Sequence, residues 1–576
     1  MYKKLFITAA LMAVCTLTNA QTMAPDYKGV GNNNPISANI FCADPTGLEY
    51  NGRLYVYGSN DHQQFIANGK KGENSYGEIK SIVVFSTDDM VNWTFHGTID
   101  TKKLCASWTP SVWYKGYGVS WAPSVTWRTT EDGTEEFFLY FCNSSHGVGV
   151  LKANSPIGPW KSPNKELMIH YDTPGANKSG TNANFDPGVT IDDNGVGWIT
   201  FGGLGPSTIM PDAARIVRLK PSMTEVDTTA VMIHAPYHFE ANELNVIGGK
   251  YVYTYCSNWA ERKDSEWNDY KAEHGINLTR PDACTMCYMV SDTPTDPNSW
   301  VYKGVYGPHP GNGTNNNHSH LQKFKGEYYH LYHNGALMES LKNNKIIESN
   351  CGVFRSLCVN KAKVNEATAT INKVTTDLVG CTQIKNLNPY ELQQAETMAS
   401  CGGVEYEDFT NVKKNGKIST LGNDASQNMQ INMKESSWIN VRKVDFGNIG
   451  AASFTLRAKG TGTMEIRTGT SPRTKIATIE FSSEEMADQT FEIPAGKLKG
   501  VKNNLYLFVT AATDFYVDAW QFTEADPTGI QLTPLTSHPS PLTSKNTYDL
   551  SGRKLSDAQQ QRGIVIKNGK KVYGTH

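Results

Sequence analysis

The chain has 576 residues, more than one ordinary hydrophobic core accommodates, which predicts two domains with additional tails. Its 54 basic and 56 acidic residues leave a net charge of −2, so the charge balance gives no reason to expect nucleic acid or an anionic membrane as partner. Aromatic residues make up 10% of the chain, charged residues 19%, and glycine occurs 50 times, a composition that favours β-structure over coiled coils or disorder.

The first twenty residues are typical of a cleavable secretory signal. Lys3 and Lys4 precede an apolar run, and the small residue Ala20 closes it. The run is too short for a membrane span, and no other apolar stretch approaches membrane length. Because Val14 before Cys15 fits a lipoprotein cleavage box poorly, we expect a secreted or periplasmic protein without a lipid anchor.

A hairpin pattern recurs five times between residues 50 and 334. Each copy has a glycine-containing turn followed by alternating aromatic and β-branched residues, as in the second strand of a hairpin. The turns contain Gly52, Gly133, Gly195, Gly249 and Gly326. Their separations of 81, 62, 54 and 77 residues leave room for about four strands per copy. This spacing predicts an all-β domain, a five-bladed β-propeller over residues 26–385.

Polar or aromatic residues precede the five turns at corresponding distances. The residues eight to twelve positions ahead of the glycines are Asp44, Trp121, Asp186, Glu240 and His318. Taken alone, an aspartate before proline is usually a turn residue. In five equivalent blades, however, these side chains would converge on one central channel, and packing alone does not explain three carboxylates there. Glu243 ranks behind Glu240 as a candidate.

Paired carboxyl groups that face each other across one sugar are what hydrolysis of a glycosidic bond requires. One protonates the leaving oxygen, and the other activates water or attacks directly. Burial and a neighbouring carboxylate raise the pKa of the proton donor, so a third acid can tune it. The sequence shows no serine or cysteine nucleophile with an ordered base.

The region from about residue 35 to 360 resembles glycoside hydrolase family 43. The matching segments cover all five copies in order and include "ADPTGLEYNGRLYVYGSND", "VSWAPSVTW", "NFDPGVTIDDNGVGWITFGG", "FEANELNVIGGKYVYTY" and "NNNHSHLQKFKGEYYHLYHN". The resemblance implies a five-bladed propeller and an inverting mechanism. It assigns Asp44 as general base, Asp186 as pKa modulator and Glu240 as general acid.

The same resemblance implies a metal ion, usually calcium, in the central channel. His318 takes the role of the nearby histidine by position, with His320 as the alternative. Oxygen-rich, watery coordination suits Ca²⁺ better than zinc. The other residues expected to line the channel or contact the sugar or the catalytic acids are Trp121, Asp61, Phe65 and Arg215.

The implied substrates are plant cell-wall polysaccharide, namely arabinoxylan, and xylo-oligosaccharides. The implied activity is that of an α-L-arabinofuranosidase, with β-xylosidase or a bifunctional enzyme as the alternative, since both pentoses present similarly placed hydroxyls. A narrow channel mouth would favour exo-action and an open cleft endo-action. A retaining fructan hydrolase and a propeller lectin without activity are more remote alternatives. They are kept because fold alone does not prove function. The sequence predicts neither oligomeric state nor disulfide pairing.

Residues 390–525 show short alternating strands at the spacing of a β-sandwich. The segments "QQAE", "VDFG" and "DFYVDAWQF" resemble carbohydrate-binding module family 6, which implies a structural calcium held by Glu396 and Asp518. Tyr406 and Trp438 are the aromatic residues expected to stack on sugars. Tyr516 stands where relatives commonly have asparagine, so the resemblance does not extend to the usual sugar-binding loop cleft. Such a module would raise the local substrate concentration.

Residues 526–576 begin with a Pro/Ser/Thr-rich linker. The ending "TYDLSGRKLSDAQQQRGIVIKNGKKVYGTH" resembles the short C-terminal sorting segments of exported Bacteroidetes proteins. This resemblance implies an association with the cell surface.

Overall fold

The computed structural model describes residues 22–29, 31–68, 74–112, 114–311, 313–314, 316–406, 413–414, 417–418, 425–470, 473–526, 547–548, 564–567 and 570–573. The expected signal segment lies outside these residues, as does most of the expected linker. The described residues divide into two compact units, one that ends at Ala525 and one that begins at Asp526. Among the described helices, none is long and apolar enough to cross a membrane.

Five antiparallel sheets follow one another along the chain, one for each predicted hairpin copy. The first contains β1 (Ala43–Tyr50), β2 (Arg53–Ser59), β3 (Ile82–Thr87) and β4 (Trp93–Ile99), and the second β5 (Trp121–Thr129), β6 (Glu135–Cys142) and β7 (Val148–Ala153). The third contains β8 (Gly188–Ile191), β9 (Gly197–Phe201), β10 (Ala214–Arg218) and β11 (Val231–Ile233). The fourth contains β12 (His238–Ile247), β13 (Lys250–Ser257), β14 (Met286–Ser291) and β15 (Val301–Gly307), and the fifth β16 (Ser319–Phe324), β17 (Glu327–Asn334) and β18 (Ser356–Ala362).

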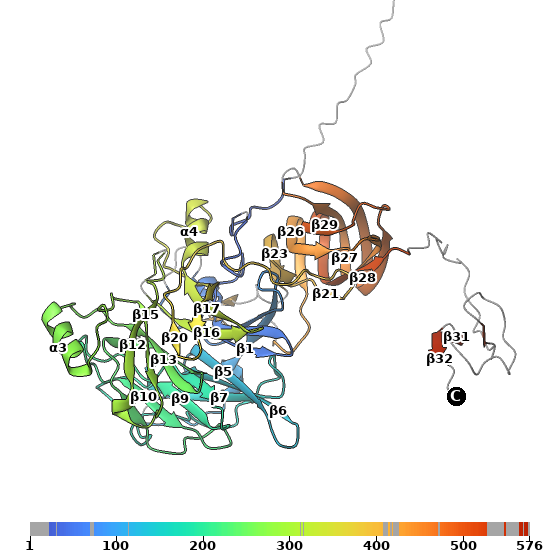
Figure 1. The fold of residues 1–576 in the computed structure, drawn as a ribbon. Helices are drawn as coiled ribbons and strands as arrows, with labels where there is room; N and C mark the ends of the chain where they lie inside the picture. Colours follow the sequence, from blue (N-terminus) through green and yellow to red (C-terminus); the bar gives the residue numbers. More distant parts are fainter. Residues whose placement is uncertain are drawn as a thin grey trace, which may run out of the picture. The chain divides into compact units, whose positions relative to one another are not determined.

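The first strands of the five sheets form a ring. β1 contacts β5, β5 contacts β8, β8 contacts β12, β12 contacts β16, and β16 contacts β1 again. Hydroxyl side chains tie neighbouring blades together: Val125 N–H donates to Thr46 Oγ1 at 3.2 Å, and Val189 N–H donates to Ser124 Oγ at 2.9 Å. The domain is therefore the predicted five-bladed propeller, with these strands innermost. Figure 1 shows its strands coloured from blue through green to yellow, in chain order.

The hairpin turns explain why the repeat is visible in the sequence. All five turn glycines adopt positive φ, between 71° and 83°, and a Cβ added to any of them would meet no atom within 4 Å. Backbone conformation, and not crowding, therefore selects glycine here.

Helices occupy the connections between strands. They are α1 (Asp61–Asn68), α2 (Thr101–Leu104), α3 (Asp264–His274) and α4 (Ala336–Asn343), with short 3₁₀ turns η2 (Ser144–His146) and η3 (Pro297–Ser299). Leu337 and Met338 of α4 pack with Phe41 and Phe354 in one apolar cluster, against which Phe65 of α1 also packs. Two short strands, β19 (Val364–Asn365) and β20 (Thr370–Ile371), pair after the fifth blade.

The second domain contains four long strands of 15 to 24 residues together with shorter ones. These are β21 (Gln393–Gln394), β23 (Ser400–Tyr406), β26 (Ile431–Asp445), β27 (Ala451–Thr468), β28 (Thr474–Glu492) and β29 (Val501–Glu524), with the small pair β24 (Lys413–Lys414) and β25 (Lys417–Ile418). They are hydrogen-bonded in the order β23-β26-β29-β27-β28, with β21 on β29. Register shifts, including one between Asn432 and Trp438, interrupt the pairing. The all-β fold class, a propeller followed by a sandwich, is as predicted.

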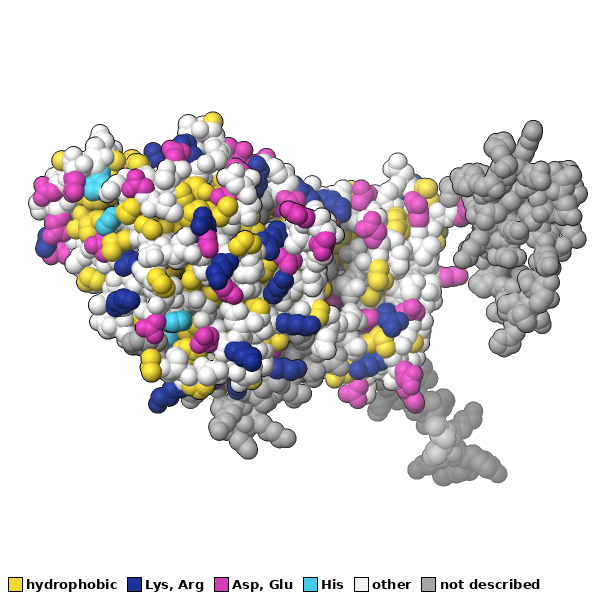
Figure 2. Space-filling model, turned by 90° about the horizontal axis from the view of Figure 1, so that it is seen from below, with side chains coloured by type: hydrophobic (Ala, Val, Ile, Leu, Met, Phe, Trp, Pro, Cys, Tyr) yellow, Lys and Arg dark blue, Asp and Glu magenta, His cyan; other side chains and the backbone are white. Residues whose placement is uncertain are grey.

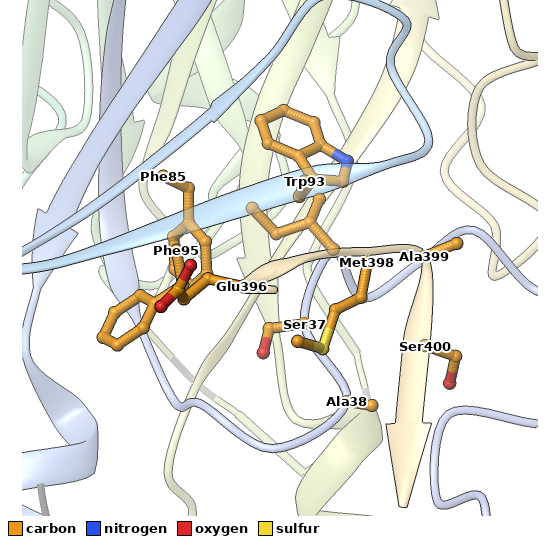
Figure 3. A pocket seen from close by; sticks show the side chains of 10 residues that line it. Ser37, Ala38, Phe85, Trp93, Phe95, Glu396, Met398, Ala399 and Ser400 are labelled. Carbon is orange, nitrogen blue, oxygen red and sulfur yellow. The ribbon is translucent and has the colours of Figure 1, made fainter. Parts of the chain in front are cut away.

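The propeller and the sandwich are joined by strand pairing and by a common core. The short strand β22 (Thr397–Met398) extends the first blade, pairing Met398 with Trp93 of β4. Figure 3 shows Phe85, Trp93 and Phe95 of the propeller beside Glu396 and Met398 around a cavity of about 10 Å³. One apolar cluster runs from these propeller side chains into the sandwich core. The two domains therefore share one hydrophobic core.

The tail unit contains a small antiparallel sheet of β30 (Thr547–Tyr548), β31 (Ile564–Lys567) and β32 (Lys570–Tyr573). On the face of the molecule drawn in Figure 2, acidic and basic side chains are interspersed, in keeping with the small net charge.

Candidate active site

Three carboxylates stand at corresponding ends of innermost strands. Asp44 is the second residue of β1, Asp186 lies two residues before β8, and Glu240 is the third residue of β12. Their exposed fractions are 5%, 4% and 8%. The predicted convergence on the centre of the ring therefore brings together three buried acids from three blades.

The backbone is strained at or next to these three acids. Four residues at the start of innermost strands adopt left-handed φ: Asp44 (49°), Ala122 (40°), Asp186 (49°) and Ala241 (63°). Non-glycine residues are uncommon in this region and cluster at functional sites. The two aspartates occupy the left-handed position itself, whereas Glu240 comes one residue before it, as Trp121 does in the second blade. Glu240 is thus offset from the aspartates by one residue.

Arg355, which the sequence analysis missed, holds Asp44. Its Nη1 donates to Asp44 Oδ1 at 2.6 Å, while Nε and Nη2 donate to Asp61 at 2.9 and 2.8 Å. Burial raises the pKa of Asp44, but the Arg355 charge, with help from His318 and His333, outweighs this and lowers the pKa to about 2. Asp44 is therefore ionised at neutral pH. The only signal in the sequence was an arginine, in "GVFRSL", directly ahead of an apolar strand.

Asn316 connects the Asp44 side of the site to the Glu240 side. Its Oδ1 accepts from Arg355 Nη1 at 2.6 Å, and its Nδ2 donates to Glu240 Oε1 at 2.6 Å. Burial, followed by the charges of Asp186 and Asp44, raises the pKa of Glu240 well above its usual value. Glu240 can therefore keep a proton under conditions in which Asp44 has lost its own.

Asp186 is fixed by the neighbouring blades. Its Oδ2 accepts from the Ala241 N–H at 2.9 Å, and Cys142 Sγ lies 3.5 Å from its Oδ1. Burial raises the pKa of Asp186, although His318 and the Ala241 N–H oppose this. The carboxyl is thus anchored from both sides and adds to the electrostatic environment that raises the pKa of Glu240.

Two histidines lie against the aspartates. His318 Nδ1 is 3.7 Å from Asp44 Oδ1 and 3.9 Å from Asp186 Oδ2. His333 Nδ1 accepts the Asp44 N–H at 3.0 Å, and its Nε2 lies 3.0 Å from Asn316 O. Burial lowers the pKa of His333 to about 3, so its ring is neutral and can accept at one nitrogen while donating at the other. The alternative channel histidine, His320, instead lies 2.9 Å from Glu243 Oε1.

Of the predicted channel-lining residues, Trp121 lies beside the site. Its Nε1 donates to Tyr76 O at 2.9 Å, and the Tyr76 ring in turn covers the Arg355 guanidinium at 5.0 Å. Phe65 contacts Phe41 and Phe354, with ring centroids 4.9 and 5.2 Å apart. Phe354 directly precedes Arg355, so Phe65 supports the Asp44 side of the site.

Asp61 and Arg215, predicted to contact the sugar or the catalytic acids, bind other partners. Asp61 is fully buried, and both its oxygens accept from Arg355, so it holds the arginine instead of facing a substrate. Arg215 donates to the backbone carbonyls of Gly175, Asp212 and Ala214, and so stabilises the third blade. Buried charged side chains form hydrogen bonds with other protein groups. The sequence pattern alone does not show which groups these are, so it suggested sugar contacts here.

One of the two sandwich residues that were predicted to contact sugar, Trp438, is buried instead. Trp438 is only 1% exposed, packs with Met23 and Ala24, and donates from Nε1 to Ala24 O at 2.7 Å. The N-terminal segment therefore covers the ring that was expected to stack on sugar, and this prediction is wrong for the structure as it stands. The side chain of Tyr406 lies outside the described residues.

The residues expected to hold calcium do not form a cage. Asp518 accepts from Asn428 Nδ2 at 2.5 Å and from Arg457 Nε at 2.9 Å, so its charge is already paired. Glu396 is buried, and burial raises its pKa well above the usual value. Within the described part of the chain, no group of three or more His, Cys, Asp or Glu side chains is arranged to hold a metal ion.

The geometry can support acid–base chemistry on a sugar. An ionised carboxylate, a carboxyl group that retains its proton and a third acid beside them are the groups that glycosidic hydrolysis needs. These groups lie in a propeller that is followed along the chain by a sandwich. The fold and the site together define a glycoside hydrolase with an appended carbohydrate-binding domain.

Comparison with known proteins gives the family. Residues 32–366 match glycosyl hydrolases family 43, and residues 394–524 match carbohydrate binding module (family 6). The chain is 33% identical to an arabinoxylan arabinofuranohydrolase of Bacillus subtilis (strain 168) over 522 residues, 88% of this chain and 95% of that one. It is also 33% identical to an arabinoxylan arabinofuranohydrolase of Paenibacillus polymyxa over 541 residues, 89% of this chain and 78% of that one.

A solved structure is similar over most of the chain. It is the crystal structure of a glycoside hydrolase family 43 arabinoxylan arabinofuranohydrolase from Bacillus subtilis in complex with cellotetraose. It superposes with a TM-score of 0.72 at 32% identity and covers 88% of this chain and 99% of its own. The chain belongs to glycosyl hydrolases family 43.

Proposed function

We propose that the protein is a secreted, exo-acting, inverting glycoside hydrolase that removes terminal α-L-arabinofuranosyl units from arabinoxylan. The observation that carries the proposal is the extent of the likeness. Similarity to arabinoxylan arabinofuranohydrolases spans both the propeller and the sandwich, about nine-tenths of the chain. A β-xylosidase or a bifunctional enzyme is the alternative that the product analysis below distinguishes.

Asp44 acts as the general base. Its pKa of about 2 keeps it ionised, and Arg355 fixes one of its oxygens. The carboxylate takes a proton from a water molecule, which attacks the anomeric carbon from the side opposite the leaving group. Because the water and not the carboxylate forms the new bond, the anomeric configuration inverts.

Glu240 acts as the general acid. Burial and the two aspartates keep it protonated, and Oε1 accepts from Asn316 Nδ2, so we place the proton on Oε2. This proton passes to the glycosidic oxygen as the bond to the anomeric carbon breaks. Asp186 contributes charge that keeps the pKa of Glu240 high, and the Ala241 N–H keeps that charge in place.

Calcium in the central channel is part of the proposal but not of the chemistry. His318, beside Asp44 and Asp186, would be the protein ligand, and water would supply most of the coordination. Such an ion would add positive charge near the two aspartates. Calorimetric titration of chelator-treated protein with CaCl₂ tests for it, and no heat of binding at millimolar calcium would remove the ion from the proposal.

Secretion rests on the charged, apolar and small-residue pattern of residues 1–20. N-terminal sequencing of protein recovered from the culture medium tests it, with a start at or close to residue 21 expected.

The product analysis uses arabinoxylan and four proteins: the wild type, Asp44→Ala, Glu240→Ala and the control Asp193→Ala, whose carboxylate is exposed in a turn. We expect the wild type and the control to release arabinose, and the two active-site variants to lose at least a hundredfold in rate. Release of xylose instead of arabinose would favour the β-xylosidase alternative. Wild-type rates in both active-site variants would overturn the assignment of base and acid.

A further inference from the structure

The strand that carries Glu240 is irregular directly after this residue. The pairing of β12 with β13 shifts register between Glu240 and Glu243, and Ala241 within the shift adopts a left-handed φ of 63°. Two residues of β12, Ala241 and Asn242, there stand opposite one residue of β13, which makes this part of the strand a β-bulge. Bulges occur beside active sites, where they change the direction in which a side chain points.

Asn242, the second residue of the bulge, is fully buried and uses its whole amide group. Its Nδ2 donates to Asp186 O at 2.8 Å and to Gly202 O at 2.9 Å. Its Oδ1 accepts from Tyr253 OH at 2.5 Å and lies 3.0 Å from His238 Nε2. Because backbone carbonyls only accept, the two bonds from Nδ2 fix the orientation of the amide, and His238 Nε2 is the donor to Oδ1.

Both residues of the bulge hold Asp186. The Ala241 N–H donates to Asp186 Oδ2 at 2.9 Å, and Asn242 Nδ2 donates to the backbone oxygen of the same aspartate. Ala241 directly follows Glu240 in the chain. The side chain and the backbone of Asp186 are therefore both fixed to β12 within two residues of the general acid.

The bulge lies where β12 is packed closely between its two neighbours. A Cβ added to Gly188 of β8 would lie 2.7 Å from Asn242 O, so this glycine allows the two strands to approach. On the other side of β12, Glu243 Oε1 lies 2.9 Å from His320 Nδ1 of β16. Asn242 is thus the bulge side chain that binds the blade of Asp186, and Glu243 is the one that contacts the fifth blade.

We infer that Asn242 is a positioning residue for the general acid, and that its amide fixes the placement of Glu240 relative to Asp186. This inference rests on the proposed function, in which Glu240 protonates the leaving oxygen. Asn242 is buried and acts through Glu240, not by contact with the substrate. A purely structural role would affect all substrates alike, whereas a positioning role affects the transfer of the proton from Glu240.

The test uses two substrates with the same sugar and different leaving groups, methyl α-L-arabinofuranoside and 4-nitrophenyl α-L-arabinofuranoside. The methoxy group needs the proton from Glu240 in order to leave, whereas nitrophenolate is a stable anion and needs little assistance. The variants are Asn242→Ala and Asn242→Asp, which keeps the shape but replaces the donating NH₂ group with an acceptor oxygen. Glu240→Ala is the reference for loss of the acid, and Asn245→Ala, at a partly exposed position of the same strand, is the control.

We expect both Asn242 variants to lower kcat on the methyl glycoside about tenfold, and on the nitrophenyl glycoside less than about threefold, with little change in KM. Glu240→Ala should show the same dependence on the leaving group with a larger loss, and Asn245→Ala should match the wild type. Melting temperatures of all variants check that they fold. If Asn242→Ala does not fold, the ratio of the two rates in Asn242→Asp decides.

Equal losses on the two substrates in the Asn242 variants, or no loss at all, would overturn the inference. The proposed function would stand in that case, provided that Glu240→Ala depends on the leaving group. If Glu240→Ala shows no such dependence, Glu240 is not the acid, and the inference fails together with the proposed function. If the wild type cleaves only xylosides, the methyl and 4-nitrophenyl β-D-xylosides replace the two substrates. A selective loss on the methyl xyloside would then support the role of Asn242 while the arabinofuranosidase assignment failed.

Discussion

At Glu240, burial and two neighbouring aspartates all favour the protonated form. Because the pKa is raised in the folded state, the native protein holds a proton that the unfolded chain releases above its usual pKa of about 4.5. The contribution of Glu240 to stability is therefore fully present below that value and is lost as pH rises through the folded pKa. Burying Glu240 therefore lowers the free energy of unfolding near neutral pH, but it provides a proton donor there.

Glu240→Gln should separate the two effects. The neutral amide keeps the shape and the bond to Asn316 but needs no proton, so we expect a larger free energy of unfolding than the wild type at pH 7 and a weaker pH dependence above pH 4.5. Activity should fall by a factor of about 10² to 10⁴. Denaturant unfolding between pH 4 and 8, with Asp193→Asn as control, measures this. A variant less stable than the wild type at pH 7 would contradict the electrostatic account.

The geometry of the strands and turns shows which site residues could be predicted from the sequence. The turn glycines predicted the five hairpins, since positive φ demands glycine, and counting back from them located Asp44, Asp186 and Glu240. Arg355 and Asn316 were not found, because they come from the loops before β18 and β16 and reach Asp44 and Glu240 only after the ring closes. Partners brought together by ring closure carry no local sequence signal.

Close packing of innermost strands also gives a test at this scale. A Cβ on Gly188 of β8 would lie 2.5 Å from Glu243 Cα and 2.7 Å from Asn242 O, so Gly188→Ala must push β8 away from β12. We expect a loss of about 1–3 kcal/mol in the free energy of unfolding, together with reduced kcat, because Asp186 and Glu240 move relative to each other. Gly77→Ala, where the added Cβ meets only Ser75 Oγ at 3.9 Å, is the control. Wild-type stability and kcat for Gly188→Ala would contradict the packing described.

Shared packing holds the described domains together. The ten cysteines among the described residues are all buried, and none of them forms a disulfide. The propeller and the sandwich are joined instead by β22 and by one apolar cluster. The sequence predicted two domains in order, but not this common core, because core residues of both domains look alike in a sequence.

Calorimetry tests whether the two domains unfold together. We expect one cooperative transition for residues 22–525, because separating the sandwich would expose Phe85, Trp93 and Phe95 to water. Deleting residues 386–576 should lower the melting temperature of the propeller, whereas deleting only residues 527–576, which belong to the separate tail unit, should leave it unchanged. Two independent transitions in the intact protein would contradict the common core.

The most direct test of the central claim is the anomeric form of the sugar at the moment of release. The account holds that Asp44 activates water on one side of the sugar while Glu240 protonates the leaving oxygen on the other. Proton NMR during the first minutes of hydrolysis, before the anomers equilibrate, should therefore show the inverted anomer accumulating first in the wild type. Initial accumulation of the retained anomer would mean that a carboxylate attacks the sugar directly, and it would contradict the roles given to Asp44 and Glu240.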